Sequence, residues 1–384
     1  QGTVGRQHQS RSERFAAALQ RSQARLDVKS KSLNADKNRM FRTVNHAFLE
    51  CLKAHPKEPF ISFFNDRREL VSYSYEESAS ILWQTIRALD RLGLKPGEKI
   101  LCDLEDTFST FHFVMACSFL RLEPVPLSSS FSPAYISLTL KKAQARFIFT
   151  TPDLVTALED VDATRIIFSQ PGSAFMQTFA FTIFINREHP VTTTLPKLEQ
   201  LADQIQADDT FMIQPTSGST GTPKLVRRTH KSFLRYGEQL VPELSAMDIR
   251  RHRFLMAPSL NHAFGWHMTT VALCLKAELA MPSKIDTQIP LHEIQRLNPS
   301  TLLFVPRVAK AVYAQILARG EPICANARLI IGAGGTGDET VLQYFRGQNL
   351  DVIEIYGSSE TSIVSRSRLK DWRPGHAGIP VADV

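Results

Sequence analysis

A run of hydroxyl and glycine residues between Thr216 and Lys224 contains side chains that suit an anionic ligand. It reads Thr-Ser-Gly-Ser-Thr-Gly-Thr-Pro-Lys, so backbone N–H groups, hydroxyl donors and one ammonium group can converge on a phosphate. The run is not a Walker A loop, because Pro223 stands in place of the second glycine and Leu225 in place of the metal-binding hydroxyl. The alternative interpretation is a flexible linker of Gly, Ser and Thr.

A second group of candidate residues follows a strand-like run. Residues 353–361 read Ile-Glu-Ile-Tyr-Gly-Ser-Ser-Glu-Thr and end in a segment with an aromatic ring, a glycine, three aliphatic hydroxyls and a carboxylate. Alternatively, Tyr356 is a core aromatic and Glu360 caps a helix. A third segment, residues 257–265, reads Ala-Pro-Ser-Leu-Asn-His-Ala-Phe-Gly. Its His262 has apolar neighbours, so a packing role is the alternative to a functional one.

Together these segments resemble the motifs of the adenylate-forming superfamily, which includes acyl-CoA synthetases, adenylation domains of peptide synthetases and luciferases. In that family a Ser/Thr/Gly-rich loop ends in Pro-Lys, and a later segment reads Tyr-Gly, any residue, Thr, Glu. Here Ser359 replaces that Thr and keeps the hydroxyl. Residues 257–265 are similar to the family's Pro-Leu-x-His-x-x-Gly, residues 331–339 to its glycine-rich turn, and residues 375–380 to its Gly-x-x-Gly-x-Pro. The five matches occur in the family's order, and the resemblance begins near Phe41.

The resemblance implies ATP-dependent adenylation of a carboxylic acid, and it assigns roles to residues of this chain. The residues expected to bind the phosphates are Thr216, Ser217, Gly218, Ser219, Thr220, Gly221 and Lys224. The residues expected to contact adenine are Tyr356, by stacking, and Gly332, Ala333 and Gly334, by their backbone. Glu360 is expected to hold Mg²⁺, a hard cation that prefers carboxylate and phosphate oxygens. The remaining nucleotide-binding candidates are Gly357, Ser358, Ser359 and Thr361, of which Ser359 or Thr361 would donate to the α-phosphate.

The pocket for the acid is expected around the third segment, with His262, Phe264 and Gly265 in its lining. His262 would lie near the attacking carboxylate without acting as a base, since a carboxylate is already ionised at pH 7. The apolar surroundings favour an apolar acyl or aryl acid over an amino acid. Lys224, Thr361 and His262 are the catalytic candidates, and they are expected to act by positioning and electrostatic stabilisation.

The elements that must position these motifs alternate between strands and helices. Residues 99–104 and 210–214 are strand-like, and a capping box at Ser74 predicts a helix that ends at Gly93. Residues 108–122 suit a buried helix but are too few to span a bilayer, and no transmembrane segment is predicted. The pattern indicates an α/β fold with mostly parallel sheets flanked by helices and a smaller β-rich part. The resemblance to N-terminal domains of acyl-CoA synthetases implies the same fold.

Charge divides the 384-residue chain into two parts. Residues 1–42 hold ten Lys or Arg against three Asp or Glu, whereas residues 43–384 carry 35 of each sign. The first part is predicted to be a basic, disordered leader, either a solvated tail or a targeting or membrane-surface segment. Residues 43–384 are predicted to form the AMP-binding domain. Nucleic-acid binding is disfavoured, because no aromatic residues interleave the basic ones.

Cysteine and histidine usage narrows the chemistry further. The 5 cysteines are isolated and form no Cys-x-x-Cys pair, which indicates buried thiols in a reducing compartment, and a cytoplasmic location is expected. The 11 histidines show no His-Glu-x-x-His spacing, so a catalytic zinc is not expected.

Motifs that follow Gly378 in the resembling family are missing from this sequence. They are a ribose-binding Asp, a hinge, and a small C-terminal lid domain whose Lys reaches the α-phosphate. The chain is therefore interpreted as an N-terminal domain without its lid, either a fragment of a longer protein or a chain whose small domain is a separate polypeptide, with weak binding and poor turnover expected. The expected activity is that of an AMP-forming acid–thiol ligase of fatty acid metabolism, with CoA as the acceptor. The alternatives are an adenylation domain that loads the phosphopantetheine thiol of a carrier protein, and a non-catalytic nucleotide-binding remnant.

Overall fold

The computed structural model describes residues 40–65, 67–102, 104, 107–127, 131–150, 164–169, 180–182, 191–217, 223–283 and 289–381. Nearly all of the basic leader and five residues of the candidate phosphate loop, Gly218, Ser219, Thr220, Gly221 and Thr222, lie outside this part of the chain. Its helices are α2 (Val44–Ala54), α3 (Tyr75–Asp90), α4 (Thr107–Phe119), α5 (Pro133–Ala143), α7 (Val191–Ala202), α8 (His230–Leu244), α9 (Ala263–Cys274), α10 (Leu291–Leu297), α11 (Pro306–Arg319) and α12 (Glu339–Gly347).

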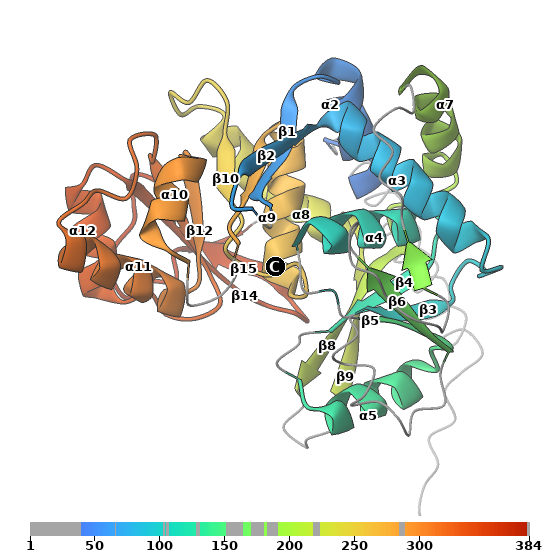
Figure 1. Ribbon diagram of the computed structural model, residues 1–384. Helices are drawn as coiled ribbons and strands as arrows, with labels where there is room; N and C mark the ends of the chain where they lie inside the picture. Colours follow the sequence, from blue (N-terminus) through green and yellow to red (C-terminus); the bar gives the residue numbers. More distant parts are fainter. Residues whose placement is uncertain are drawn as a thin grey trace, which may run out of the picture.

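The described strands form three sheets (Figure 1). The largest has nine strands in the order β16 (Ile379–Pro380), β15 (Ser362–Arg366), β14 (Asp351–Ser358), β13 (Leu329–Gly332), β12 (Thr301–Phe304), β10 (Arg253–Leu255), β11 (Glu278–Met281), β1 (Pro59–Phe64) and β2 (Leu70–Ser74). A five-stranded sheet has the order β4 (Glu123–Pro126), β3 (Lys99–Cys102), β5 (Phe147–Thr150), β6 (Thr164–Ser169) and β7 (Ala180–Thr182). The third sheet is a hairpin of β8 (Thr210–Ser217) and β9 (Pro223–Thr229).

Most strand pairs in the two larger sheets are parallel. The run from β14 through β13, β12, β10 and β11 to β1 is parallel throughout, and only β2, β15 and β16 pair in the antiparallel sense at the edges. The five-stranded sheet is entirely parallel. The predicted α/β fold with mostly parallel sheets flanked by helices is therefore confirmed.

Local sequence signals account for helix α3. Ser74 Oγ accepts a hydrogen bond from the Glu77 N–H at 3.2 Å, and Glu77 Oε2 accepts one from the Ser74 N–H at 2.8 Å. This is the predicted capping box, which satisfies two N–H groups that the first turn leaves free. The helix itself ends at Asp90, and Gly93 adopts a φ of +67° in the turn that follows.

Helices α4 and α9 form the centre of the main core. All of α4 except Phe108 is buried, which confirms the buried helix predicted over residues 108–122. On α9, the fully buried Trp266 stacks on Phe111 of α4 at 5.9 Å between ring centroids and meets Phe211 of β8 edge-on at 5.1 Å. These contacts fix α9 relative to the β8–β9 hairpin.

Two further expectations can be compared with the described residues. No helix in this part of the chain is both long enough and apolar enough to cross a membrane. All five cysteines are free, and four of them are buried. Burial raises the pKa of the Cys51 thiol to about 12, so this thiol stays protonated at neutral pH.

Candidate functional site

Three of the sequence motifs lie along one edge of the nine-stranded sheet. Strands β10, β12, β13 and β14 run parallel, so their carboxyl ends point to the same edge. Residues 257–265 follow β10, the glycine turn follows β13, and Tyr356 lies near the end of β14. Strand β11 lies on one side of β10, and the next strand of the chain, β12, lies on the other side. The strand order therefore reverses at β10. Open α/β sheets bind their ligands at such a reversal, outside the carboxyl ends of the strands.

The glycine turn after β13 is held against β14 by a carboxylate. Gly332 is the register partner of Glu354 on β14. Glu354 Oε1 accepts a hydrogen bond from the Gly337 N–H at 3.2 Å, and Oε2 accepts one from the indole N–H of Trp372 at 2.7 Å. Gly334 has a φ of +83°, which favours glycine. A shallow hollow opens at this turn, with Gly332 and Glu354 in its lining.

Tyr356 presents its ring to solvent. It belongs to β14 together with Gly357 and Ser358, so these residues continue the strand where the sequence placed them after it. The Tyr356 side chain is 60% exposed, which excludes the core-aromatic alternative. At Gly357 a Cβ would lie 2.1 Å from the Ser362 carbonyl oxygen, so only glycine fits this crossing of β14 and β15. The exposed ring is available to stack on a planar ligand.

Hydroxyl groups close the turn that carries Glu360. Ser358 Oγ accepts hydrogen bonds from the N–H groups of Glu360 at 3.2 Å and Thr361 at 3.1 Å. The Ser358 N–H donates to Thr361 Oγ1 at 3.2 Å. Glu360 is exposed and lies between antiparallel strands, so it does not cap a helix. The turn therefore presents a carboxylate to solvent, and its hydroxyl groups bond to its own backbone.

The candidate phosphate loop connects the two strands of the β8–β9 hairpin. Thr216 pairs with Lys224 across the hairpin, and Ser217, of which only the backbone is described, pairs with Pro223. The Lys142 ammonium group near the end of α5 donates to the Pro223 carbonyl at 2.7 Å. In Figure 1 the hairpin and α5 lie together at the bottom of the view. Lys224 is exposed at this end of the hairpin.

Strand β9 separates the loop from helix α8, a feature that the sequence interpretation missed. Phe233, Tyr236 and Leu240 recur at helical spacing and are buried in α8, but this helix begins only at His230. The loop therefore ends in a strand, and no helix N-terminus follows it directly. Any phosphate held here would be bound by loop N–H groups, hydroxyls and Lys224.

The segment expected to line an acid pocket forms the start of α9. His262 is the N-cap residue of this helix and its side chain is exposed, so it is not a core packing residue. At Gly265 a Cβ would lie 2.4 Å from the Ser259 carbonyl oxygen, so glycine allows the first turn of α9 to touch the preceding loop. Phe264 is partly buried against the main core. His262, Phe264 and Gly265 therefore follow the carboxyl end of β10, where the strand order reverses.

Two buried polar residues that no motif indicated connect these segments. Arg228 of β9 is 2% exposed and donates through Nη1 to the Ser359 carbonyl oxygen, next to Glu360. Through Nη2 it donates to Nε2 of His267 on α9 at 3.1 Å. Burial lowers the pKa of Arg228, whose charge the nearby Glu360 favours, and burial and the Arg228 charge lower the pKa of His267. His267 is therefore a neutral acceptor for the guanidinium group.

A weak sequence signal for Arg228 was present. Arg227 and Arg228 are neighbours in a seven-residue strand, and successive side chains of a strand point to opposite faces. One of the two must therefore point inward. Arg227 instead pairs with Glu123 at 2.9 Å, and its side chain is 66% exposed.

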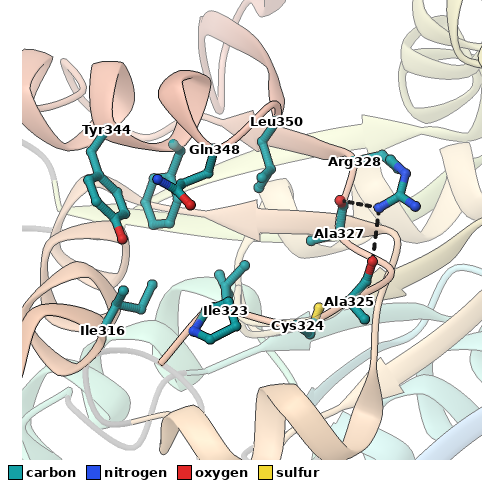
Figure 2. Close-up of a pocket in the computed structure, with 11 residues that line it drawn as sticks. Ile316, Ile323, Cys324, Ala325, Ala327, Arg328, Tyr344, Gln348 and Leu350 are labelled. Atoms are coloured by element: carbon teal, nitrogen blue, oxygen red, sulfur yellow. Dashed lines mark hydrogen bonds between the residues drawn. The ribbon is translucent and has the colours of Figure 1, made fainter. Parts of the chain in front are cut away.

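A separate hollow of about 140 Å³ lies between α11 and α12, away from these motifs (Figure 2). Its lining includes Ile323, Cys324 and Tyr344. The Arg328 guanidinium group in its wall donates to the carbonyl oxygens of Ala325 at 3.0 Å and Ala327 at 2.8 Å. The charged group of this hollow is thus bonded to its own chain, and none of the predicted site residues lines the hollow.

Comparison with known proteins agrees with this arrangement. Residues 48–384 match the family model for AMP-binding enzyme. Over 279 residues the chain is 22% identical to 2-succinylbenzoate–CoA ligase of Bacillus licheniformis, covering 72% of this chain and 53% of that protein. Over 299 residues it is 23% identical to nonribosomal peptide synthetase GRA1 of Gibberella zeae, covering 76% of this chain and 3% of that protein.

A solved structure shows the same fold. The crystal structure of the anthranilate CoA ligase AuaEII in complex with anthranoyl-AMP superposes with a TM-score of 0.77. The sequences are 17% identical, and the match covers 91% of this chain and 66% of that one. The chain spans about half the length of the curated 2-succinylbenzoate–CoA ligases that it matches.

Proposed function

Because this chain belongs to the family of AMP-binding enzymes, we propose that it binds ATP and activates a carboxylic acid by adenylation. The observation that carries the proposal is the pairing of β13 with β14. These strands are parallel neighbours, so the glycine turn and the exposed Tyr356 lie at the same edge of the sheet. A planar base can stack on the ring and run along a backbone that has no side chains in its way.

Adenylation solves a chemical problem. A carboxylate is a poor electrophile, because it is anionic and delocalised. One of its oxygens attacks the α-phosphorus of ATP, the bond from that phosphorus to the bridging oxygen breaks, and pyrophosphate leaves with the bonding electrons. The acyl-adenylate then carries AMP as a leaving group. The protein contributes mainly by positioning and by stabilising charge.

The proposed roles follow the positions of the side chains. Lys224 and the loop from Thr216 onward bind the β- and γ-phosphates from the end of the β8–β9 hairpin. Ser359 or Thr361 donates to the α-phosphate from the hairpin turn. Thr361 Oγ1 accepts from the Ser358 N–H at 3.2 Å and donates to the Ser362 carbonyl oxygen at 3.4 Å, so its hydroxyl proton would exchange this long bond for one to the nucleotide.

Glu360 suits a magnesium ion that enters with ATP. Among the described residues no group of three His, Cys, Asp or Glu could hold a metal ion, so Glu360 can supply only part of a coordination shell. Mg²⁺ commonly takes one or two carboxylates and completes its shell with phosphate oxygens and water. The exposed turn is compatible with that arrangement. When bound, the ion would neutralise charge on the phosphates.

We propose an apolar acyl or aryl acid as the substrate. The pocket is assigned to the start of α9, where Phe264 lies beside His262. The relatives support an aryl acid, since two of them are named as ligases of 2-succinylbenzoate and anthranilate. In this pocket His262 orients the carboxylate without taking a proton from it.

The acceptor of the acyl group is proposed to be the thiol of CoA. The thiol sulfur attacks the acyl carbon, AMP leaves, and the thiol proton passes to solvent. The CoA ligases among the relatives support this acceptor, whereas the peptide-synthetase relative supports a carrier-protein thiol as the second candidate. The five free cysteines support a reducing, cytoplasmic location.

Binding of non-hydrolysable acyl-adenylate mimics tests the proposal without requiring turnover. Acyl-sulfamoyl adenosines carrying aryl, fatty acyl or aminoacyl groups are titrated by calorimetry against AMP as the reference. We expect an aryl or fatty acyl mimic to bind at least about 100-fold more tightly than AMP, because reaction-intermediate mimics use both subsites. If no mimic binds more tightly than AMP, the adenylation proposal is wrong, and if an aminoacyl mimic binds best, the proposed acid class is wrong.

Transfer is tested separately, by acid-dependent exchange of labelled pyrophosphate into ATP followed by addition of CoA. Formation of an acyl-CoA supports the first acceptor. Consumption of the adenylate only when a carrier protein is added identifies the second.

A further inference from the structure

Arg228 lies where three segments of the proposed site meet. Its strand, β9, also carries Lys224 and follows the candidate phosphate loop. Its Nη1 bonds to the carbonyl oxygen of Ser359 in the Glu360 turn, and its Nη2 bonds to His267 on α9, the helix that begins after His262. One side chain thus contacts both the nucleotide turn and the helix assigned to the acid pocket.

The surroundings of Arg228 are not those of a residue that stabilises the fold. The guanidinium group is 5.5 Å above the ring of Phe233, and its Nε has no hydrogen-bond partner among the described residues. His267 is stacked on Tyr236 at 3.7 Å, and in the same part of the chain its Nδ1 has no partner either. A buried cation with incomplete hydrogen bonding is costly, and an apolar side chain of similar volume is often neutral or stabilising in its place.

The hairpin that carries the turn has other contacts, but they lie beyond the turn. Ser362 Oγ donates to the Ser232 carbonyl of α8 at 3.3 Å, and Arg366 pairs with Glu243 of α8. Both contacts hold β15. Arg228 contacts the turn itself, one residue before Glu360.

We propose that Arg228 is a positioning residue, which holds the Glu360 turn and strand β9 in the relative geometry that the nucleotide site requires. The inference about the turn rests on the contacts above, and its consequence for nucleotide binding rests on the proposed function. Without the Arg228 contact, the carboxylate and the Thr361 hydroxyl move independently of the Lys224 strand. Binding then has to order the turn, which lowers affinity.

Amide hydrogen exchange of peptides covering residues 356–366 tests the inference without nucleotide. In Arg228→Met we expect exchange in the turn to be at least about 10-fold faster, with β8 and β1 unchanged. Arg228→Lys keeps the charge and a donor and should restore part of the protection. Arg227→Met removes a charge from the next position of the same strand and should leave the turn as it is. Unchanged exchange in Arg228→Met overturns the proposal.

Thermal unfolding and calorimetry with AMP and Mg-ATP separate positioning from stability. We expect Arg228→Met to keep or raise the melting temperature and yet bind both nucleotides about 10-fold more weakly. A lower melting temperature with faster exchange throughout the chain would show a purely structural role and overturn the proposal. If the parent protein binds neither nucleotide, the proposed function fails, whereas the exchange of the turn still decides the role of Arg228.

Discussion

Lys224 is an exposed ammonium group at the end of the β8–β9 hairpin, beside the candidate phosphate loop. If it binds the β- and γ-phosphates, Lys224→Ala should weaken ATP binding by about 10- to 100-fold, the usual effect of losing a charged hydrogen bond. AMP binding should stay nearly unchanged, because AMP lacks those phosphates. Calorimetry with both nucleotides measures the difference. Lys231→Ala, an exposed lysine at the start of α8, is the matched control, and equal losses for ATP and AMP would place Lys224 elsewhere.

Glu360 offers an exposed carboxylate on a turn that its neighbours hold in place. Glu360→Gln should remove most of the Mg²⁺ dependence of ATP binding, because an amide oxygen lacks the charge that a hard divalent cation requires. Binding isotherms with and without Mg²⁺ give the result. Glu339→Gln changes an exposed carboxylate of α12 and should keep the dependence. Metal-dependent binding that is equal in Glu360→Gln and the parent protein would contradict a metal-binding role.

The motifs could be found from residue types alone, but the side chains that contact them could not all be found in this way. The sequence shows the short motifs that contain Tyr356, Glu360 and Lys224, and the residue types in those motifs indicate nucleotide binding. Arg228 and His267 are 39 positions apart in the chain, and nothing local to either residue shows that they touch. Their pairing depends on the packing of α8, which follows β9, against α9, and local sequence does not reveal that packing.

At the scale of the element, Gly265 allows α9 to begin against the loop that follows β10. Gly265→Ala places a methyl group 2.4 Å from the Ser259 carbonyl oxygen, so the helix start must shift. We expect the free energy of unfolding to fall by about 1–3 kcal/mol, the usual range for overpacking. Gly347→Ala is the control, because a Cβ there meets nothing within 4 Å. That variant should be neutral or up to about 1 kcal/mol more stable, as urea unfolding can measure.

If Gly265→Ala and the parent protein unfold at the same urea midpoint, the loop before α9 can shift without loss of stability. In that case the close approach of Gly265 to Ser259 does not constrain the proposed acid pocket.

The elements differ in how far the sequence could predict them. The capping box at Ser74 predicts helix α3, and a continuous apolar run predicts helix α4. Strand β9 was missed because its burial does not alternate: Pro223 and Arg228 are buried while the positions between them are partly or fully exposed. Among the described strands β9 pairs only with β8, and it contains a buried arginine. It therefore lacks the alternation of apolar and polar residues on which strand prediction depends.

For the whole molecule, the order of strands could not be predicted from the sequence. The alternation of strands and helices indicated parallel sheets, but not that β10 would lie between β11 and β12. That placement creates the reversal of strand order, and it brings residues from segments about 100 positions apart to one edge. The candidate site therefore depends on the order of the strands in the sheet. The sequence shows each motif separately but does not show that the motifs lie together.

Four histidines of the described part of the chain are buried, and three of them are almost completely enclosed. His112 packs against Phe108 and Phe111, and each of His112, His230 and His267 is at most 2% exposed. Burial lowers the pKa of His112 to about 4 and that of His230 to about 3, with a small contribution from His46. Burial and the Arg228 charge hold the pKa of His267 well below 6.5. His112 and His230 are therefore neutral in the folded protein at pH 5.5 but largely protonated in the unfolded chain, and the shift of His267 acts in the same direction.

Because the unfolded chain binds more protons, stability is fully present above pH 6.5 and is lost as the pH falls toward the folded-state pKa values. Between pH 7.5 and 5.5 the free energy of unfolding should fall by on the order of 1 kcal/mol for each of His112 and His230, and His267 should add to the fall. Urea unfolding at constant ionic strength measures the fall. His112→Phe should remove part of it, and His292→Gln, which changes an exposed histidine, is the control. A flat profile between these pH values would mean that the buried histidines accept protons without unfolding the protein.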